Sequence, residues 1–224
     1  MRNIKIALDG PAGAGKSTVA KEVARALGIV YIDTGAMYRT AALYMIRQGI
    51  DIKNEKEKLI KNLDGIKMDI LHTEDGQKMM LGNEDVSGKI RTEQVSMGAS
   101  DIAVIPEVRL KLVEMQRVLA KSKSVIMDGR DIGTYVLPDA ELKIFLTATP
   151  ECRAERRYKE LSERGENCNF DDILNDIKKR DKNDSEREFA PLKCADDAVY
   201  LDSTELNREQ VIEKIINLYE DLIK

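Results

Sequence analysis

Gly10-Pro-Ala-Gly-Ala-Gly-Lys-Ser17 matches the phosphate-loop pattern G-x-x-x-x-G-K-[ST] at every fixed position. An apolar stretch typical of a buried strand, residues 4–8, precedes it, and a stretch with helical periodicity follows and stops at Gly28. In such a loop, glycines let successive N–H groups point at phosphate oxygens. A Gly-rich turn that only joins a strand to a helix is the alternative, but a chance match has a probability of about 1% or less. The sequence therefore predicts nucleotide binding.

The predicted nucleotide-binding residues are Gly10, Pro11, Ala12, Gly13, Ala14, Gly15, Lys16, Ser17 and Thr18. Lys16 is expected to reach the β- and γ-phosphates, and the Ser17 hydroxyl is expected to ligate Mg²⁺. Two aspartates that follow predicted strands, Asp33 and Asp128, are equal candidates for holding the metal through water.

Bulk composition limits the classes of function. The 224 residues suit one domain with insertions or two small ones, and 42% hydrophobic residues allow a substantial core. The net charge of −4 argues against a large nucleic-acid surface, and no apolar run reaches the length of a membrane span. Cys152, Cys168 and Cys194 are odd in number and lack C-x-x-C spacing, which favours a reducing cytoplasm. We therefore expect a cytoplasmic protein with neither a membrane nor a nucleic-acid partner.

Strand and helix patterns alternate along the chain, which predicts an α/β fold with a mostly parallel sheet and ligands at the carboxyl ends of its strands. The predicted strands are residues 4–8, 29–32, 124–127, 142–146 and 198–201. The predicted helices are 17–27, a segment after Gly35 that ends near 47, 54–63, a helix opened by Pro106, 150–164, 170–181 and 207–223. The last helix is expected to turn Val211, Ile215, Leu218 and Leu222 inward.

Two segments differ from this alternation. Residues 67–91 alternate as strands do, carry the single histidine (His72) and include a hairpin-type turn at 81–84, which predicts an inserted β segment. The helices at 150–164 and 170–181 have few apolar positions, so we expect them to form a mobile cover.

Arginines point to phosphoryl transfer, because a guanidinium fork grips phosphate with two parallel bonds and never deprotonates. The candidates are Arg39, Arg109, Arg130, Arg153, Arg156, Arg157, Arg180 and Arg187. A solvated surface charge is the simpler interpretation of any one of them. Arg130 is the exception, because it follows a strand and lies between Asp128 and Asp131. The guanine-reading motif N-K-x-D of GTP-type switches is absent from the sequence.

Several motifs occur together behind the phosphate loop: Asp33-Thr-Gly-Ala-Met-Tyr-Arg39, Glu84-Asp-Val-Ser-Gly-Lys-Ile-Arg91, Asp128-Gly-Arg-Asp-Ile-Gly-Thr134, Arg180-Asp-x-x-Asp184-x-x-Arg187 and Pro191-Leu192. With them, nearly the whole chain resembles the bacterial cytidylate kinase family. The resemblance implies a three-layer P-loop kinase fold with a central, mostly parallel sheet. It also implies a core (about 1–35, 101–150 and 188–224), a nucleoside-monophosphate-binding insert region (about 36–100) and a helical lid (about 151–187).

The resemblance further implies that ATP donates its γ-phosphoryl group to CMP or dCMP, with Mg²⁺, in a monomeric enzyme. By the same resemblance, Thr34, Asp131 and Arg109 face the cytosine. Arg39, Arg130 and Arg187 lie near phosphate, and Ser100, Arg180 and Asp184 lie at the sugar. Lid arginines matching Arg153 and Arg157 approach the transferring phosphoryl group, although the spacing leaves open which arginine of that helix does so. Lys16, Arg130, Arg153, Arg157 and Arg187 are thus the expected catalytic residues.

Other interpretations stay open at this stage. The chain could act on UMP, AMP or shikimate with the same fold, or it could be a regulatory or RNA-associated module that hydrolyses ATP slowly. Thr34 could cap a helix N-terminus, and Asp131 could cap a helix end. The paired motifs D-G-R-D and R-D-x-x-D-x-x-R favour the kinase, and a carboxylate at position 131 would accept from the cytosine amine but repel a uracil carbonyl.

Overall fold

A computed structural model describes residues 3–73 and 76–224, with the backbone alone for residues 72 and 76. Its backbone contacts divide the chain into two compact units. The first comprises the residues up to Tyr31 together with Ser122–Lys224, and the second comprises Ile32–Lys121. Within the described ranges, no helix is long and apolar enough to cross a membrane. These units differ from the core, insert and lid regions expected from the resemblance, and that functional division stays a prediction.

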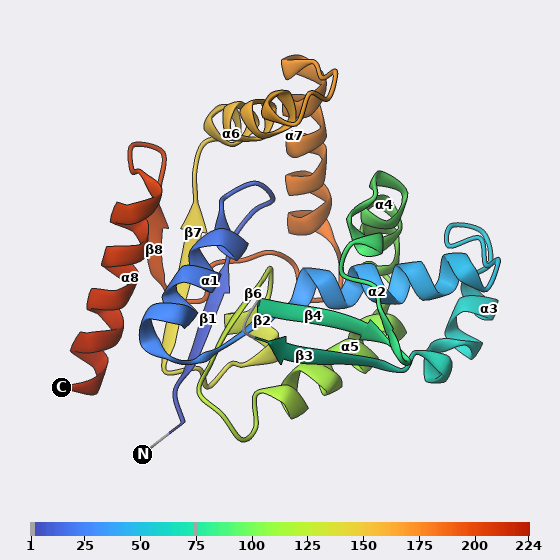
Figure 1. Cartoon of the computed structure of the whole chain (residues 1–224), viewed down its shortest axis with the longest axis horizontal. Coiled ribbons are helices and arrows are strands. Elements are labelled where there is room, and N and C mark those ends of the chain that lie inside the picture. The colour runs from blue at the N-terminus through green and yellow to red at the C-terminus, as the bar shows by residue number, and fades with distance from the viewer. Residues whose placement is uncertain (1–2, 74–75) are drawn as a thin grey trace. The chain divides into compact units, whose positions relative to one another are not determined.

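The larger sheet has five strands in the order β2-β6-β1-β7-β8 (Figure 1), and all of them belong to the first unit except β2, which the unit boundary divides after Tyr31. The strands are β1 (Lys5–Asp9), β2 (Val30–Asp33), β6 (Val125–Gly129), β7 (Leu142–Thr147) and β8 (Val199–Asp202). β1 pairs in parallel with both β6 and β7, and β7 pairs in parallel with β8. The predicted mostly parallel sheet is therefore confirmed, and the carboxyl ends of these strands meet at one edge.

Helices α1 (Lys16–Leu27) and α8 (Arg208–Ile223) pack with this sheet around one apolar cluster. Val211 and Ile215 are buried in it, and Leu218 packs against it, as predicted. The inward orientation predicted for Leu222 is wrong, because this side chain is 43% exposed. Among the described residues of α8, the apolar cluster reaches only to Tyr219, so Leu222 lies beyond it.

A short π-helical turn, Ile132–Val136, follows β6, and Asp9 at the end of β1 holds it in place. The Asp9 carboxylate accepts from the backbone N–H of Ile132 at 2.8 Å and from that of Gly133 at 2.7 Å. Burial raises the pKa of Asp9 to about 6, although these two hydrogen bonds act in the opposite direction. Asp9 thus ties the loop after β6 to the start of the phosphate loop.

Two charged helices, α6 (Pro150–Glu163) and α7 (Phe170–Glu186), pack on each other after β7. The predicted end of the second helix, at 181, is wrong, because α7 continues to Glu186. No glycine or proline interrupts the sequence between Phe170 and Glu186, so nothing local stops the helix earlier. The extension places Asp184 within α7 and Arg187 at its end.

The second unit contains four helices and a three-stranded antiparallel sheet among its described residues. The helices are α2 (Thr34–Arg47), α3 (Lys56–Lys61), α4 (Glu93–Ile102) and α5 (Pro106–Leu119), and the strands are β3 (Met68–Thr73), β4 (Gly76–Leu81) and β5 (Glu84–Asp85). Short 3₁₀ turns cover Leu63–Gly65 and Lys89–Arg91. The inserted β segment is confirmed, with His72 in β3, whereas α4 was not predicted.

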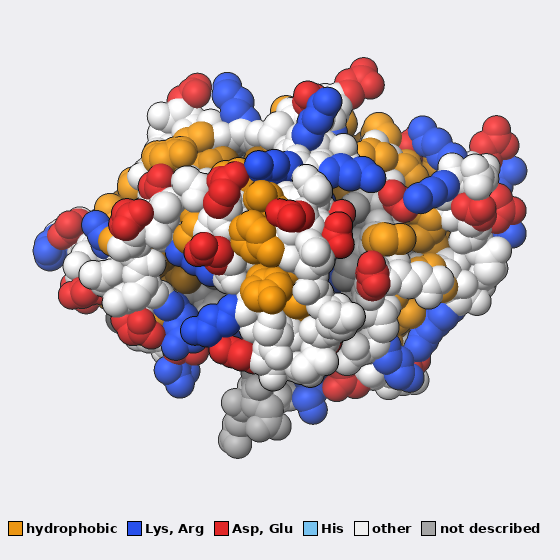
Figure 2. Space-filling view, turned by 90° about the horizontal axis from the view of Figure 1, so that it is seen from above, with side chains coloured by type: hydrophobic (Ala, Val, Ile, Leu, Met, Phe, Trp, Pro, Cys, Tyr) orange, Lys and Arg blue, Asp and Glu red, His pale blue; other side chains and the backbone are white. Residues whose placement is uncertain are grey.

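Charged side chains of both signs are interspersed on the face shown in Figure 2. Several ion pairs of the described residues are short-range pairs along a helix, such as Arg25–Glu22 at 2.6 Å with side chains 81% and 41% exposed. Exposed pairs of this kind contribute only about 0–1 kcal/mol. The less exposed ion pairs at the carboxyl edge of the first sheet are a different case and are described below.

Gly10 leaves no room for a side chain. A Cβ atom at this position would lie 1.9 Å from the Leu146 carbonyl oxygen, and φ is +149°. We expect Gly10→Ala to lower the free energy of unfolding by about 2–4 kcal/mol, because backbone of β7 must move. Thermal and urea unfolding followed by circular dichroism measure the loss.

The matched control is Gly88→Ala, because Gly88 has φ −77° and open space where its Cβ would lie. It should change stability by no more than about 0.5 kcal/mol. Equal stability of the two variants would contradict the close approach of Gly10 to β7.

Candidate active site

The phosphate loop follows β1 and ends where α1 begins. Gly10, Gly13 and Gly15 have φ values of +149°, +76° and +82°, which side-chain-bearing residues rarely adopt. No side chain of the described residues caps α1, whose N-cap is Gly15. The first N–H groups of the helix are thus not capped by a side chain of the described residues, an arrangement that suits an anion.

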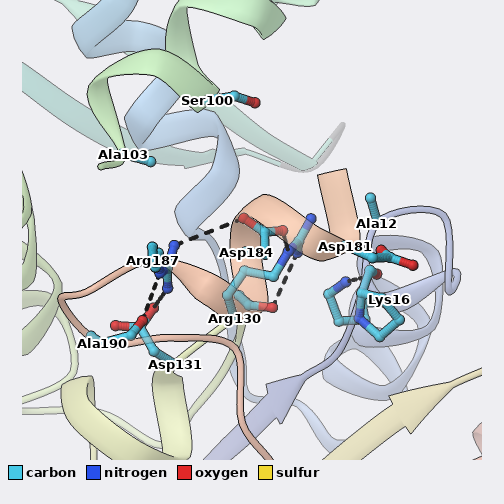
Figure 3. A network of polar contacts seen from close by, with 12 residues as sticks. Ala12, Lys16, Ser100, Ala103, Arg130, Asp131, Asp181, Asp184, Arg187 and Ala190 are labelled. Carbon is cyan, nitrogen blue, oxygen red and sulfur yellow. Dashed lines mark hydrogen bonds and ion pairs between the residues drawn. The ribbon is translucent and has the colours of Figure 1, made fainter. Parts of the chain in front are cut away.

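Lys16 is buried at the start of α1, with a side-chain nitrogen that donates to the Pro11 carbonyl at 2.7 Å (Figure 3). Burial and the positive charge of Arg130 lower the pKa of Lys16 to about 7, against the opposing influence of Asp128 and Asp9. An anion in the loop would favour the charged ammonium and raise this pKa. Lys16 is therefore suited to gain its proton when phosphate binds.

The Ser17 hydroxyl donates to Asp128 Oδ2 at 2.7 Å, at the carboxyl end of β6. Hydroxyl and carboxylate oxygens are ligands that Mg²⁺ prefers, so this pair fits the metal. The other candidate, Asp33, lies in the second unit, where it caps α2 by accepting from Ala36 N at 2.7 Å and pairs with Arg39 at 3.2 Å. The geometry thus favours Asp128. Among the described residues, no group of three or more His, Cys, Asp or Glu side chains forms a metal cage.

Two ion pairs cross between the loop after β6 and the end of α7 (Figure 3). Arg130 Nε donates to Asp184 Oδ2 at 2.8 Å, and Arg187 Nη2 donates to Asp131 Oδ1 at 3.2 Å. Arg187 Nη1 also lies 3.9 Å from Asp184 Oδ1. The structure therefore brings together four of the predicted site residues, two from each motif.

Arg187 is held from a third side. Its Nε donates at 2.7 Å to the carbonyl of Ala190, a residue with φ +49°. A non-glycine residue in this region costs roughly 1 kcal/mol or more and persists only where its surroundings impose it. Here Leu192 N donates to the Asp184 carbonyl at 2.8 Å, which closes the loop back onto α7.

The three arginines of α6 have different contacts. Arg153 is buried; it donates to the carbonyls of Ala148 and Ala12, each at 2.9 Å, and pairs with both carboxylate oxygens of Asp181 at 2.6 and 3.0 Å. Arg153 therefore braces the phosphate loop at Ala12. The other two contact different groups: Arg156 binds Ser203, and Arg157, 45% exposed, pairs with Glu160.

Four predicted substrate residues belong to the second unit. Thr34 is the first residue of α2 and is buried. The helix cap is Asp33, so the alternative role of Thr34 as N-cap is wrong. Arg39 lies one turn further along α2 and pairs with Asp33. Ser100 is exposed on α4.

Arg109, on α5, is 1% exposed. It donates from Nη1 to the Ala103 carbonyl at 3.2 Å, and its guanidinium carbon lies 5.7 Å from the centroid of the Tyr38 ring. Burial of a cation on an aromatic face holds its planar group in one orientation. Such an orientation suits recognition of a flat ligand.

Arg180, the remaining predicted sugar residue, is exposed on α7, and no ion pair of it occurs among the residues that the structure describes. Asp9 and Asp181 were missed in the sequence. Asp9 had a signal, since it is the first polar residue after an apolar strand and directly precedes Gly10. Asp181 is a fixed position of the motif that begins at Arg180, but the motif gave no indication that it would pair with Arg153.

We expect nucleotide binding to take up a proton. At pH 8 the free protein carries Lys16 mostly neutral, since its pKa is about 7. A bound polyphosphate raises that pKa, so ATP binding at pH 8 should take up about 0.9 proton. Titration calorimetry in buffers of different ionisation enthalpy measures the uptake. Lys16→Met should abolish it, and identical heats for the parent protein in all buffers would contradict the prediction.

Arg153→Lys should weaken ATP binding about 10-fold, because lysine cannot span Ala12, Ala148 and Asp181 and one charge-assisted hydrogen bond is worth roughly 1.5 kcal/mol. Calorimetric titration with ATP measures the change.

Arg156→Lys is the matched control on the same helix. It should lower the melting temperature by loosening the contact with Ser203, while the dissociation constant for ATP stays within about 2-fold. Equal ATP affinity of Arg153→Lys and the parent would show that Arg153 does not support the loop.

Known proteins resemble this chain in sequence and in fold. The family described as cytidylate kinase matches residues 6–221. A cytidylate kinase from Caldicellulosiruptor saccharolyticus is 53% identical over 223 residues, which cover 100% of this chain and 98% of the relative. One from Exiguobacterium sibiricum is 50% identical, with both chains covered fully. The crystal structure of an uncharacterized protein from Eubacterium ventriosum has a TM-score of 0.55 at 14% identity, covering 97% of this chain and 99% of that one, which supports the fold alone. On the family match and these relatives, the chain belongs to the cytidylate kinase family.

Proposed function

We propose that this member of the cytidylate kinase family transfers the γ-phosphoryl group of ATP to CMP or dCMP, which gives ADP and CDP or dCDP. The observation that carries the proposal is the pair of crossed ion pairs Arg130–Asp184 and Arg187–Asp131 in the same unit as the phosphate loop. A nucleotide switch would need the loop alone. Two guanidinium groups held beside it suit a second phosphate, that of an acceptor.

In the donor half, the backbone N–H groups of the loop and Lys16 would hold the ATP phosphates. Ser17 would ligate Mg²⁺, and Asp128 would hold the metal through water. Magnesium, when bound, neutralises charge on the phosphate oxygens. The enzyme would require Mg²⁺ and would act as a monomer. It would work in the cytoplasm, with neither a membrane nor a nucleic-acid partner.

In the acceptor half, Arg130, Arg187 and Arg39 would bind the monophosphate. Each is paired with a carboxylate in this structure, and a dianionic phosphate can share or replace that partner. Asp131, Thr34 and Arg109 would face the cytosine. The proposed sugar contacts are Ser100, Arg180 and Asp184.

Chemistry at this site needs no general base, because the acceptor oxygen belongs to an already ionised phosphate. Positioning and charge stabilisation carry the rate. Of the lid arginines, Arg153 would act through the loop that it braces. Arg157, whose guanidinium is half exposed, would be the one to reach the transferring phosphoryl group.

A panel of acceptors tests this function. With ATP as donor, ADP release is expected to be fastest with CMP or dCMP, slower with UMP and negligible with AMP or shikimate. In Asp131→Asn, an amide can donate to the uracil carbonyl, so the CMP/UMP ratio of kcat/KM should fall about 10-fold, equivalent to roughly 1.4 kcal/mol. The KM for ATP should change little.

Asp139→Asn, at an exposed position in the same segment, is the matched control and should keep the parental ratio. Faster turnover of UMP than of CMP by the parent protein would reject the proposed base recognition. An unchanged CMP/UMP ratio in Asp131→Asn would remove Asp131 from the base site.

A further inference from the structure

The carboxylate of Asp128 is held from two sides. Ser17 donates to Oδ2 at 2.7 Å, and the phenol of Tyr31 donates to Oδ1 at 3.0 Å. The three side chains come from α1, β2 and β6, and β2 and β6 are neighbours in the sheet. Asp128 is 4% exposed and Tyr31 7% exposed, so the contact is shielded from water.

The Tyr31 ring packs in the core, whereas its hydroxyl forms a hydrogen bond. The ring belongs to the apolar cluster beneath α1, where a phenylalanine ring would fill the same space. Burying a hydroxyl adds a desolvation cost, which only a hydrogen bond offsets. The hydroxyl donates to the carboxylate that Ser17 also contacts. Packing therefore explains the ring, whereas Asp128 explains the hydroxyl.

A carboxylate bonded at one oxygen can still rotate about its side-chain torsion. A second donor on the other oxygen fixes the plane of the group, as outer-shell partners fix the ligands of metal sites. The ring itself is held in turn: Lys21, one turn after Ser17 on α1, places its ammonium 5.9 Å from the ring centroid.

We propose that Tyr31 is a positioning residue for the binding of ATP together with Mg²⁺. Its hydroxyl holds Asp128 so that Oδ2 stays directed at Ser17. The inference rests on the part of the proposed function in which the phosphate loop binds ATP with Mg²⁺. It does not depend on which monophosphate accepts the phosphoryl group.

The test uses Tyr31→Phe, which keeps the ring and removes the hydroxyl. ATP is titrated calorimetrically into the full-length protein, once with EDTA and once with millimolar MgCl₂. Metal-free ATP should bind Tyr31→Phe within about 2-fold of the parent. The gain in ATP affinity caused by Mg²⁺ should fall about 10-fold. Tyr200→Phe, at an exposed position on β8, should keep both values.

A second variant separates positioning from packing. In an Asp128→Asn background, which removes the carboxylate, adding Tyr31→Phe should cause no further loss of the magnesium-dependent gain. Two results would overturn the proposal. One is a magnesium-dependent gain in ATP affinity in Tyr31→Phe equal to that of the parent. The other is an equal loss of this gain when Tyr31→Phe is added to the parent and to Asp128→Asn. The acceptor panel tests the proposed function separately, because a protein that binds ATP with Mg²⁺ but does not phosphorylate CMP would fail that panel and leave the Tyr31 result interpretable.

Discussion

Arginine side chains buried in the first unit are paired with carboxylates, and these ion pairs hold its separate segments together. Arg187 and Asp131 are each less than a tenth exposed and pair with each other, and Arg153 is buried against Asp181. Isolated charges at such positions would be too costly, because a buried ion without a partner loses its hydration and gains nothing in return. The guanidinium groups of Arg130, Arg153 and Arg187 are thus already neutralised by carboxylates of the chain itself.

This compensation also connects distant segments of the chain. The crossed pairs tie the loop after β6 to the end of α7, and Arg153 ties α6 and α7 to the phosphate loop at Ala12. Asp9 adds a fourth connection, between β1 and the π-helical turn. Side chains on separate elements are therefore held before any ligand arrives, which limits the reorganisation that binding requires.

Local patterns were sufficient for most of the elements and for the phosphate loop, but not for α4. The G-x-x-x-x-G-K-[ST] spacing requires glycine at positions whose φ values are positive in the structure. Alternation of apolar strands with amphipathic helices indicates a parallel sheet, whose geometry brings the ends of β1 and β6 to one edge. Errors occurred where a local signal was missing: α7 has no stop before Glu186, and Leu222 is apolar but lies past Tyr219, the last described residue of α8 in the apolar cluster.

By itself, the sequence determined the α/β class, the phosphate loop and the motifs shared with the cytidylate kinase family, because these depend on residue type and spacing along the chain. Only the tertiary structure decided the partner of each charge. Arg153, Arg156 and Arg157 are alike in the sequence, yet one braces the phosphate loop, one binds Ser203 and one stays half exposed. Their contacts depend on which face of α6 each occupies and on segments up to 141 residues away. No local pattern encodes such distances, because they result from packing the whole unit.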